Sequence, residues 1–572
     1  MGSRVLAMVV AAMAVGQLSG SASSAAPQAG SLSQLSGTAG CTFQAPEVGD
    51  DPSPLAGVCG EARGIESPGA IVVSPDGRNV YVAAAGADAV AVFSRNAATG
   101  VLHQLTGSAG CVAESADGGC AAAHPLFQVS AVAVSPDGRN VYAAGPNGVA
   151  IFSRSQTGAL SQAAAPRGCV TSDESDDGCT GVVAMDDPSA LAVSPDGRNL
   201  YVASGAGYSV VVLARDNAGG LSQLAGNDGC VAPPSDDEDE VPLSLPCTLA
   251  DVFSSPPAGT LTAVSPIAVS PDGRNVYVAS NGALAAFRRS PTSGALSSAG
   301  CLASSQVVDS GLNCQVGRSL GATTSISLTP DGRTVLVSSS PIVSEEGDVD
   351  SGMALMRRDP TSGALQQPPG ASGCATASGS DGCATGRGLA ADLNSPYAPN
   401  AVSISPDGRN IYVATTTGGE ESGTIAALSL SPSGSVAQLP NALGCLGDST
   451  AGCTPVRGLT GANSIAVSPD GRNVYATGYF DDSVVSLLRT RPTTTITVRT
   501  TGNGSVRSTP AGLQCPKRCT MSFPIGQTVS LIATPRKGVT FSGWTGLCKA
   551  KVRMCKLVVT SAGTIGATFH KR

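Results

Sequence analysis

Residues 131–144 read Ala-Val-Ala-Val-Ser-Pro-Asp-Gly-Arg-Asn-Val-Tyr-Ala-Ala, which is two apolar runs joined by a polar turn. Proline sets φ near −65° at its turn position, and glycine takes the positive φ that a tight reversal requires. Two short apolar runs on either side of such a turn predict a β-hairpin.

The same turn recurs along the chain. A Ser/Thr-Pro-Asp-Gly-Arg sequence begins at Ser74, Ser135, Ser194, Ser270, Thr329, Ser405 and Ser468. A third apolar run follows each hairpin, as in 90–93, and in most copies a fourth follows a glycine-containing turn, as in 101–105. Seven repeats of four antiparallel strands are typical of a β-propeller, with a linear solenoid as the alternative.

The two ends of the repeat region favour a closed ring. The seventh repeat ends at Arg489-Thr490 without a fourth strand, whereas residues 30–35 have the sequence of a spare fourth strand. We expect that strand to complete the last blade and remove the exposed edges of an open sheet. The predicted fold is all-β, a seven-bladed β-propeller closed by an N-terminal strand, with a small C-terminal β-domain.

The repeat also resembles a known type. Residues 268–279, Ala-Val-Ser-Pro-Asp-Gly-Arg-Asn-Val-Tyr-Val-Ala, resemble YVTN-type propeller repeats, and residues 30–490 resemble the lactonase-like propeller family that includes bacterial 6-phosphogluconolactonases. That resemblance implies hydrolysis of a phosphorylated lactone inside the cell. Tyrosine recurs at one strand position, where we expect it to pack: Tyr81, Tyr142, Tyr201, Tyr277, Tyr412 and Tyr475.

The N-terminal sequence predicts export. Arg4 precedes an apolar run over 5–15 and then small residues, so residues 1–26 are predicted to be a signal peptide, with a buried helix as the alternative. No second apolar stretch reaches the roughly 20 residues of a membrane-spanning helix. We therefore assign 27–490 to the propeller and expect a secreted, extracellular protein.

The 18 cysteines agree with an oxidising compartment. Fourteen form close pairs along the repeats: Cys41/Cys59, Cys111/Cys120, Cys169/Cys179, Cys230/Cys247, Cys301/Cys314, Cys374/Cys383 and Cys445/Cys453. Cys515, Cys519, Cys548 and Cys555 make two further local pairs. Zinc ligation is the rival interpretation, but three histidines and no Cys-x-x-Cys motif make nine local disulfides the prediction.

Residues 491–572, the C-terminal module, differ in composition from the ring. They contain 13 Lys and Arg, no Asp or Glu, and the single tryptophan, Trp544. Runs such as 495–498 and 528–533 alternate as strands do, and 502–506, 543–546 and 567–569 carry a resemblance to the divergent internalin B-repeat module found in secreted bacterial proteins. The resemblance implies a role in surface display or adhesion.

Propeller topology places the recurring Pro-Asp-Gly-Arg turns and the cysteine loops at opposite ends of the blades. We call these the turn face and the disulfide face. Most of the 42 acidic residues fall in loops of the disulfide face, where converging carboxylates predict a Ca²⁺ site. The candidates near the third strands are Asp88, Glu345, Asp348, Glu420, Glu421, Asp481 and Asp482. Solvated loops, or docking of the basic module onto this face, are the alternatives.

The sequence offers few catalytic groups. His103, His124 and His570 do not recur, no nucleophile-elbow or phosphate-binding motif is present, and the catalytic residues are unknown. Arginines at the third-strand ends are expected to offset the turn aspartates: Arg95, Arg154, Arg215, Arg289, Arg358 and Arg489. The prediction is a secreted bacterial binding or scaffold protein at the cell surface; the alternative is a lactonase-like, calcium-assisted hydrolase. Expected partners are a protein or an anionic cell-envelope polymer, and no nucleic acid for the acidic propeller.

Overall fold

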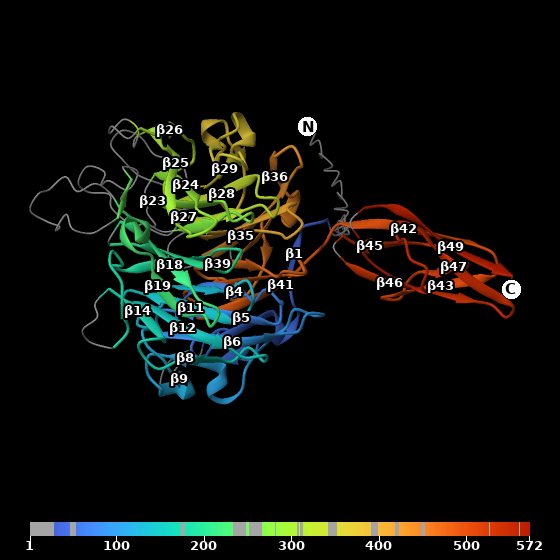
Figure 1. Ribbon diagram of the computed structural model, residues 1–572, viewed down its shortest axis with the longest axis horizontal. Coiled ribbons are helices and arrows are strands. Elements are labelled where there is room, and N and C mark those ends of the chain that lie inside the picture. Colours follow the sequence, from blue (N-terminus) through green and yellow to red (C-terminus); the bar gives the residue numbers. More distant parts are fainter. Residues whose placement is uncertain are drawn as a thin grey trace, which may run out of the picture.

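The computed structural model describes residues 28–571 apart from 46–52, 173–177, 207, 233–246, 251–265, 281, 306–307, 309–312, 341–351, 390–398, 418–421, 448–451, 526 and 560. The predicted signal peptide lies outside the described residues. Among these residues, no helix has the length and apolar character needed to cross a membrane. Figure 1 shows a ring of sheets with a separate β-module at the C-terminal end.

Seven sheets surround one axis. Their innermost strands are β4 (Pro68–Val73), β10 (Ala131–Val134), β16 (Pro188–Val193), β22 (Ile267–Val269), β27 (Ala322–Leu328), β33 (Pro399–Ile404) and β39 (Ala462–Val467). Each contacts the next in this order, and β39 contacts β4, so the ring is closed. The all-β, seven-bladed propeller is confirmed, and blades are numbered 1 to 7 from β4.

Blade 1 shows how a repeat folds. After β4, the chain forms β5 (Asn79–Ala84) and β6 (Ala89–Arg95), and its fourth strand is broken into β7 (Leu102–Gln104) and β8 (Cys111–Ala113). The prediction of four strands per repeat was incomplete, because β9 (Ala121–Ala122) adds a fifth, outermost strand parallel to β8.

The other blades repeat this order. Blade 2 has β11 (Asn140–Gly145), β12 (Gly148–Arg154), β13 (Leu160–Gln162), β14 (Cys169–Thr171) and β15 (Thr180–Gly181). Blade 3 has β17 (Asn199–Ser204), β18 (Ser209–Arg215), β19 (Leu221–Gln223), β20 (Cys230–Ala232) and β21 (Thr248–Leu249). Blade 4 has β23 (Asn275–Ser280), β24 (Ala283–Arg289), an unbroken β25 (Leu296–Ala303) and β26 (Gln315–Val316).

Blade 5 has β28 (Thr334–Ser340), β29 (Gly352–Arg358), β30 (Leu365–Gln366), β31 (Cys374–Thr376) and β32 (Ala384–Thr385). Blade 6 has β34 (Asn410–Thr417), β35 (Ser422–Leu430), β36 (Val436–Gln438), β37 (Cys445–Gly447) and β38 (Thr454–Pro455). Short 3-10 turns, such as η1 (Gly37–Gly40), η2 (Gly107–Gly110), η4 (Gly226–Gly229) and η9 (Asn441–Gly444), separate the two halves of the fourth strand.

Blade 7 is completed from the other end of the described chain. Its strands β40 (Asn473–Gly478) and β41 (Ser483–Arg489) are joined by β1 (Leu32–Gln34) and β2 (Cys41–Gln44), which both pair antiparallel with β41. Leu32 lies opposite Arg489, and β3 (Gly60–Ala62) forms the outer strand. The predicted closure by the N-terminal strand is confirmed.

The nine predicted disulfides are all present, and no cysteine is free among the described residues. In every blade the second cysteine directly precedes the outermost parallel strand, as Cys120 precedes β9. The disulfide thus holds a two- or three-residue strand against the fourth strand. So short an outer strand leaves little exposed edge for pairing with another molecule.

Reduction is expected to release these outer strands before the blades unfold. The seven ring disulfides span 8 to 18 residues, for which chain entropy gives about 2–3 kcal/mol each. Hydrogen exchange after mild reduction should rise first in β9 and its counterparts while the far-UV circular dichroism signal persists. Early loss of the whole β signal would contradict this order.

The C-terminal module is a sandwich of two four-stranded sheets (Figure 1). One contains β42 (Thr493–Thr501), β45 (Thr520–Pro524), β47 (Val539–Gly546) and β49 (Gly563–Lys571); the other contains β43 (Gly504–Thr509), β44 (Gln514–Cys515), β46 (Thr528–Pro535) and β48 (Met554–Val558). Trp544 and Phe569 are buried between them, and Trp544 donates its indole N–H to the Val552 carbonyl at 3.0 Å. The module therefore has an apolar core of its own.

Candidate functional site

The innermost strands of the seven blades carry no titratable side chain. The seven innermost strands contain only Gly, Ala, Val, Leu, Ile, Pro, Ser, Thr and Asn. Some of their hydroxyls bond between neighbouring blades, as the Ser464 side chain does in accepting the Ile71 amide at 3.2 Å. General acid–base chemistry along the axis would need groups from the loops at either end.

Three of the predicted calcium ligands lie in described loops of the disulfide face. Asp482 accepts the Ser67 amide at 2.7 Å, and Asp88 accepts the Gln128 amide at 2.6 Å. These two carboxylates occupy equivalent turns in blades 7 and 1, and each reaches the loop that leads into the next blade. Their bonds hold Ser67 and Gln128 at φ values of 49° and 47°, in the left-handed region.

The third carboxylate, Asp481, accepts the Thr460 amide at 2.8 Å. Burial raises the pKa of Asp482, and the neighbouring charge of Asp481 raises it further, against the Ser67 amide that lowers it. Each of these three aspartates accepts a backbone amide and so stabilises a loop of the disulfide face. Glu345, Asp348, Glu420 and Glu421 lie outside the described residues, and within the described part no cluster of three or more His, Cys, Asp or Glu could hold a metal ion. The calcium site stays a prediction.

One histidine has an acidic partner that the sequence did not indicate. His124 contacts Glu114 through Nδ1, and the same carboxylate accepts the Leu126 amide. A carboxylate on Nδ1 fixes the orientation of an imidazole and stabilises its protonated form, as a general base requires. His103 on β7 and His570 on β49 are exposed to solvent.

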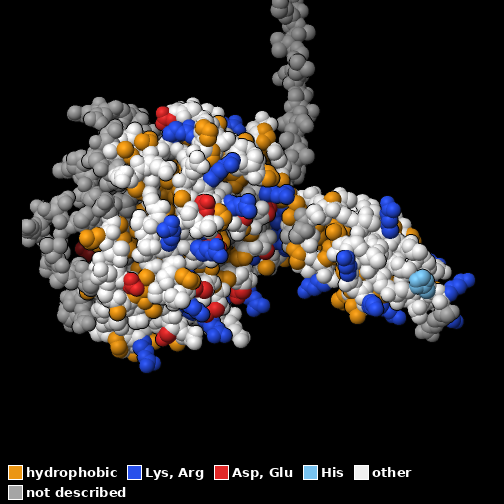
Figure 2. All heavy atoms as spheres, turned by 45° about the horizontal axis from the view of Figure 1, so that its top comes forward, with side chains coloured by type: hydrophobic (Ala, Val, Ile, Leu, Met, Phe, Trp, Pro, Cys, Tyr) orange, Lys and Arg blue, Asp and Glu red, His pale blue; other side chains and the backbone are white. Residues whose placement is uncertain are grey.

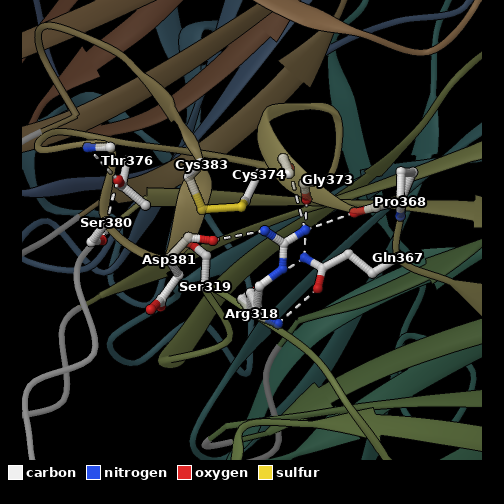
Figure 3. Close-up of a disulfide and its surroundings, with 12 residues drawn as sticks. Arg318, Ser319, Gln367, Pro368, Gly373, Cys374, Thr376, Ser380, Asp381 and Cys383 are labelled. Atoms are coloured by element: carbon white, nitrogen blue, oxygen red, sulfur yellow. Dashed lines mark hydrogen bonds between the residues drawn. A yellow bond between two sulfur atoms is a disulfide. The ribbon is translucent and has the colours of Figure 1, made fainter.

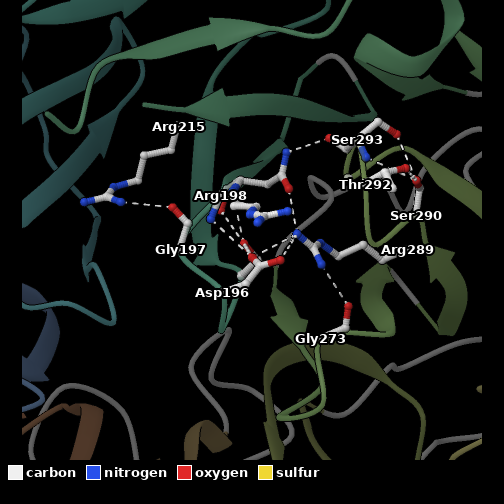
Figure 4. Close-up of polar contacts among 12 residues, drawn as sticks. Asp196, Gly197, Arg198, Arg215, Gly273, Arg289, Ser290, Thr292 and Ser293 are labelled. Atoms are coloured by element: carbon white, nitrogen blue, oxygen red, sulfur yellow. Dashed lines mark hydrogen bonds and ion pairs between the residues drawn. The ribbon is translucent and has the colours of Figure 1, made fainter. Parts of the chain in front are cut away.

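On the turn face, arginines bond all but one of the blades to the blade before it. Arg289 of blade 4 donates from Nε to the Tyr201 hydroxyl at 2.8 Å and from Nη1 to the Gly273 carbonyl at 3.1 Å. Its Nη2 reaches both Asp196 oxygens, at 3.0 and 2.9 Å, and the Asn199 side-chain oxygen at 2.7 Å (Figure 4). We call this arrangement the arginine clamp.

Six of the seven seams carry the clamp. Its ion pairs are Arg95–Asp470, Arg154–Asp76, Arg215–Asp137, Arg289–Asp196, Arg358–Asp272 and Arg489–Asp407. The predicted offset of the turn aspartates by the arginine column is confirmed. The recurrent tyrosines are buried, as expected, and burial raises the pKa of Tyr201 to about 12. Their hydroxyls, which also bond the next blade, as Tyr201 bonds the Gly294 carbonyl at 2.8 Å, were not anticipated.

The clamps predict a loss of stability in acid. Burial alone would raise the pKa of Asp407, but Arg489, the Ser405 hydroxyl and the Arg409 amide outweigh it, so the pKa is lowered below 3.8. A carboxyl with a lowered folded-state pKa contributes stability above its unfolded pKa and loses it as the pH falls through the folded value. The melting temperature should fall progressively below about pH 4.

Asp407→Asn gives the matched control for that titration. The variant should be less stable at pH 7 but should lose less stability than the wild type between pH 5 and pH 2. Equal slopes for the two proteins would show that Asp407 does not contribute. Asp482, whose pKa is raised, acts in the opposite direction, because its ionisation costs stability as the pH rises.

The seam between blades 5 and 6 lacks the clamp. Leu430 stands where the arginine would be, Leu336 replaces the tyrosine, and Thr334 replaces the asparagine, while Asp331 of the turn is retained. Leu336 and Leu430 belong to one apolar cluster. A groove of about 630 Å³ lies at this seam and is lined by Asp331, Thr334 and Leu430 among others.

A second set of ties crosses the disulfide face. Gln367 of blade 5 bonds both the amide and the carbonyl of Arg318, at 2.7 and 2.9 Å, and also the Gly373 carbonyl at 3.0 Å. Arg318 donates to the carbonyls of Pro368 and Asp381, beside the Cys374–Cys383 disulfide (Figure 3). Equivalent glutamines are Gln34, Gln104, Gln162, Gln223 and Gln438. The recurring Leu-x-Gln sequence was the signal available for five of these six.

Comparisons with known proteins agree with both resemblances. Residues 49–110 match the family described as lactonase, 7-bladed beta-propeller, and residues 494–572 match the divergent InlB B-repeat domain. No curated protein matches the chain.

Solved structures similar to the chain include three of low identity. Hydrazine synthase of Kuenenia stuttgartiensis is 15% identical, with a TM-score of 0.42, over 74% of this chain and 96% of that chain. A putative 6-phosphogluconolactonase of Bacteroides uniformis is 16% identical, with a TM-score of 0.40, over 67% and 85%. A periplasmic gluconolactonase of Pseudomonas aeruginosa is 18% identical, with a TM-score of 0.41, over 65% and 84%. The architecture of this chain is established by its own strand pairing.

Proposed function

We propose that the protein is an exported, lactonase-like hydrolase that is held at the cell envelope by its C-terminal module. The observation that carries the hydrolase is the family match over residues 49–110, which include most of blade 1. The innermost strands lack an acid or base, and at six seams the turn aspartates are paired with arginines, so we place the reacting groups in the disulfide-face loops. Asp88, Asp481, Asp482 and the His124–Glu114 pair are the described candidates there.

Lactone hydrolysis needs an activated water and stabilisation of the developing oxyanion. A Ca²⁺ ion in the acidic loops would supply Lewis-acid assistance when bound, and His124 would accept the proton of the water. The test is turnover of simple and sugar lactones, with added calcium and again with chelator. Calcium-dependent turnover that His124→Gln slows supports the proposal, whereas no turnover under either condition contradicts it.

A binding or scaffold role is the second candidate. It is favoured because the recurrent polar residues form bonds between blades. In the described ring, the third-strand arginines, the tyrosines and aspartates that they bind, and the recurring glutamines form bonds between blades. They build a rigid ring and leave the variable loops to contact a partner. An inactive ring in the lactone assay that still binds a cell-envelope component would favour this role.

The C-terminal module is suited to an anionic polymer. Every lysine and arginine from Arg499 to Lys571 is exposed, and Figure 2 shows basic side chains without acidic ones over the visible face of this module. Uncompensated positive charge attracts polyanions by a salt-dependent electrostatic term.

Removing residues 491–572 is expected to abolish retention on cells and leave a folded ring. A variant with Lys549, Lys551, Arg553 and Lys556 changed to glutamine keeps the module and should weaken retention, with the difference disappearing at high salt. Retention that is unchanged in both variants would contradict the assigned role.

A further inference from the structure

The unclamped seam between blades 5 and 6 has the features of a binding site that the proposed hydrolase does not use. We propose that its groove binds a guanidinium group, presented as an arginine side chain by a protein partner. Six seams of the same ring already hold a guanidinium in the equivalent place. This seam keeps part of the receptor for it but supplies no arginine.

The retained receptor is the turn carboxylate. Asp331 accepts the Thr329 hydroxyl at 2.6 Å and the Arg333 amide at 3.0 Å. Asp196, which binds an arginine at its own seam, is held by the same two bonds at 2.6 and 3.2 Å. Asp331 is exposed and takes part in no ion pair with the residues that the structure describes. A carboxylate fixed in this orientation is suited to a forked guanidinium contact.

A second acceptor of the clamp is also kept. At the occupied seams, a glycine carbonyl of the following turn accepts Nη1 of the arginine, as Gly273 does for Arg289. The equivalent residue here is Gly408, which lines the groove together with Asp331.

Leu430 explains why the space is open. It is 7% exposed and occupies the strand position of the missing arginine, but its side chain is too short to reach the turn carboxylate. Together with Thr334, which is 9% exposed, it forms the floor of a groove of about 630 Å³. The apolar floor can contact the methylene groups of an arginine side chain, and the carboxylate above it can bind the guanidinium.

The surrounding arginines do not prevent this occupancy. Arg333 and Arg409 are turn arginines, which every other seam also carries beside its bound guanidinium. Arg357 donates to the Ser433 carbonyl at 2.6 Å. Its counterpart in blade 4, Arg288, donates in the same way to the Ser362 carbonyl at 3.2 Å, next to the occupied clamp of Arg358.

The test uses the full chain and ethylguanidinium as the probe, followed by ligand-observed NMR. We expect saturable binding that exceeds that of ethylammonium by about fivefold, because only the planar fork matches the carboxylate. Asp331→Asn and Leu430→Arg should each remove the binding, the first by deleting the acceptor and the second by filling the site. Arg139→Ala, at a clamped seam, is the matched control and should bind as the wild type does.

Two results would overturn the proposal. One is equal binding of ethylguanidinium and ethylammonium, which would indicate simple charge attraction. The other is binding that survives both Asp331→Asn and Leu430→Arg in proteins whose melting curves show them to be folded. Arginine-containing and lysine-containing peptides of the same length then extend the comparison to a protein partner, and we expect only the arginine peptide to compete with the probe.

Discussion

Replacing Arg489 with alanine is expected to reduce the free energy of unfolding of the ring by about 3–5 kcal/mol, the usual cost of removing one partner of a buried ion pair. The Arg489 side chain is 1% exposed. It bonds the Tyr412 hydroxyl at 2.9 Å, both Asp407 oxygens at 2.9 Å, and the Asn410 side chain at 2.6 Å. The change would leave these groups with fewer partners at the seam between blades 6 and 7, on the strand that pairs with β1.

The natural sequence of the unclamped seam supplies the control for this experiment. Arg489→Leu combined with Tyr412→Leu and Asn410→Thr copies the side chains found between blades 5 and 6. Replacing a whole buried polar set by apolar residues costs less than breaking it, so the triple variant should be more stable than Arg489→Leu alone. Denaturant unfolding measures both, and a triple variant that is the less stable of the two would show that Tyr412 and Asn410 act independently of Arg489.

Removing the closing strands is expected to have the largest effect of all. Deletion of residues 28–44, with Cys59→Ser to avoid a free thiol, takes away buried Leu32, Cys41 and Phe43 and leaves the long edge of β41 unpaired. Loss of a buried phenylalanine alone typically costs about 3–5 kcal/mol, and an exposed strand edge promotes association between molecules. Sedimentation and thermal melting should show an unstable ring that self-associates.

Complementation distinguishes loss of the strand from general damage. A synthetic peptide of residues 28–44 should reverse the added self-association and raise the melting temperature of the deleted protein, because β1 and β2 bind β41 through backbone pairing that needs no covalent link. A deleted ring that does not self-associate more than the wild type and melts as the wild type does would contradict the closing role of these strands.

The fold could be predicted from the sequence because its determinants repeat. The Pro-Asp-Gly-Arg turns, the alternating runs and the cysteine pairs each recur seven times. The spare strand at 30–35 was identifiable as the missing member of a regular series. The outer strands such as β9 were missed, since two residues have no periodicity and their pairing depends on the adjacent disulfide.

The sites were less predictable, for a physical reason. A sequence shows that Arg289 and Asp196 recur, but only the blade order shows that each arginine reaches back to the preceding repeat. The groove beside Leu430 follows from three substitutions that are unremarkable one at a time. The predicted calcium ligands all lie in loops between the second and third strands of a blade. That position alone does not determine whether their carboxylate oxygens converge, and Asp88 and Asp482 each accept a backbone amide of another loop.

Closure by β1 also sets an order for folding. Ser31 and Thr490 bond across 459 positions of sequence, so the earliest described strand to be synthesised acquires its partner only after all seven hairpins have been made. Contacts of such long range form slowly, because the entropy of closing the loop must be overcome first. The ring disulfides do not depend on that step. Each joins cysteines only 8 to 18 residues apart in sequence, so their thiols can meet while the rest of the chain is still unfolded. The disulfides can therefore form between cysteines that are close in sequence, and the last step of assembly is the pairing of β1 with β41.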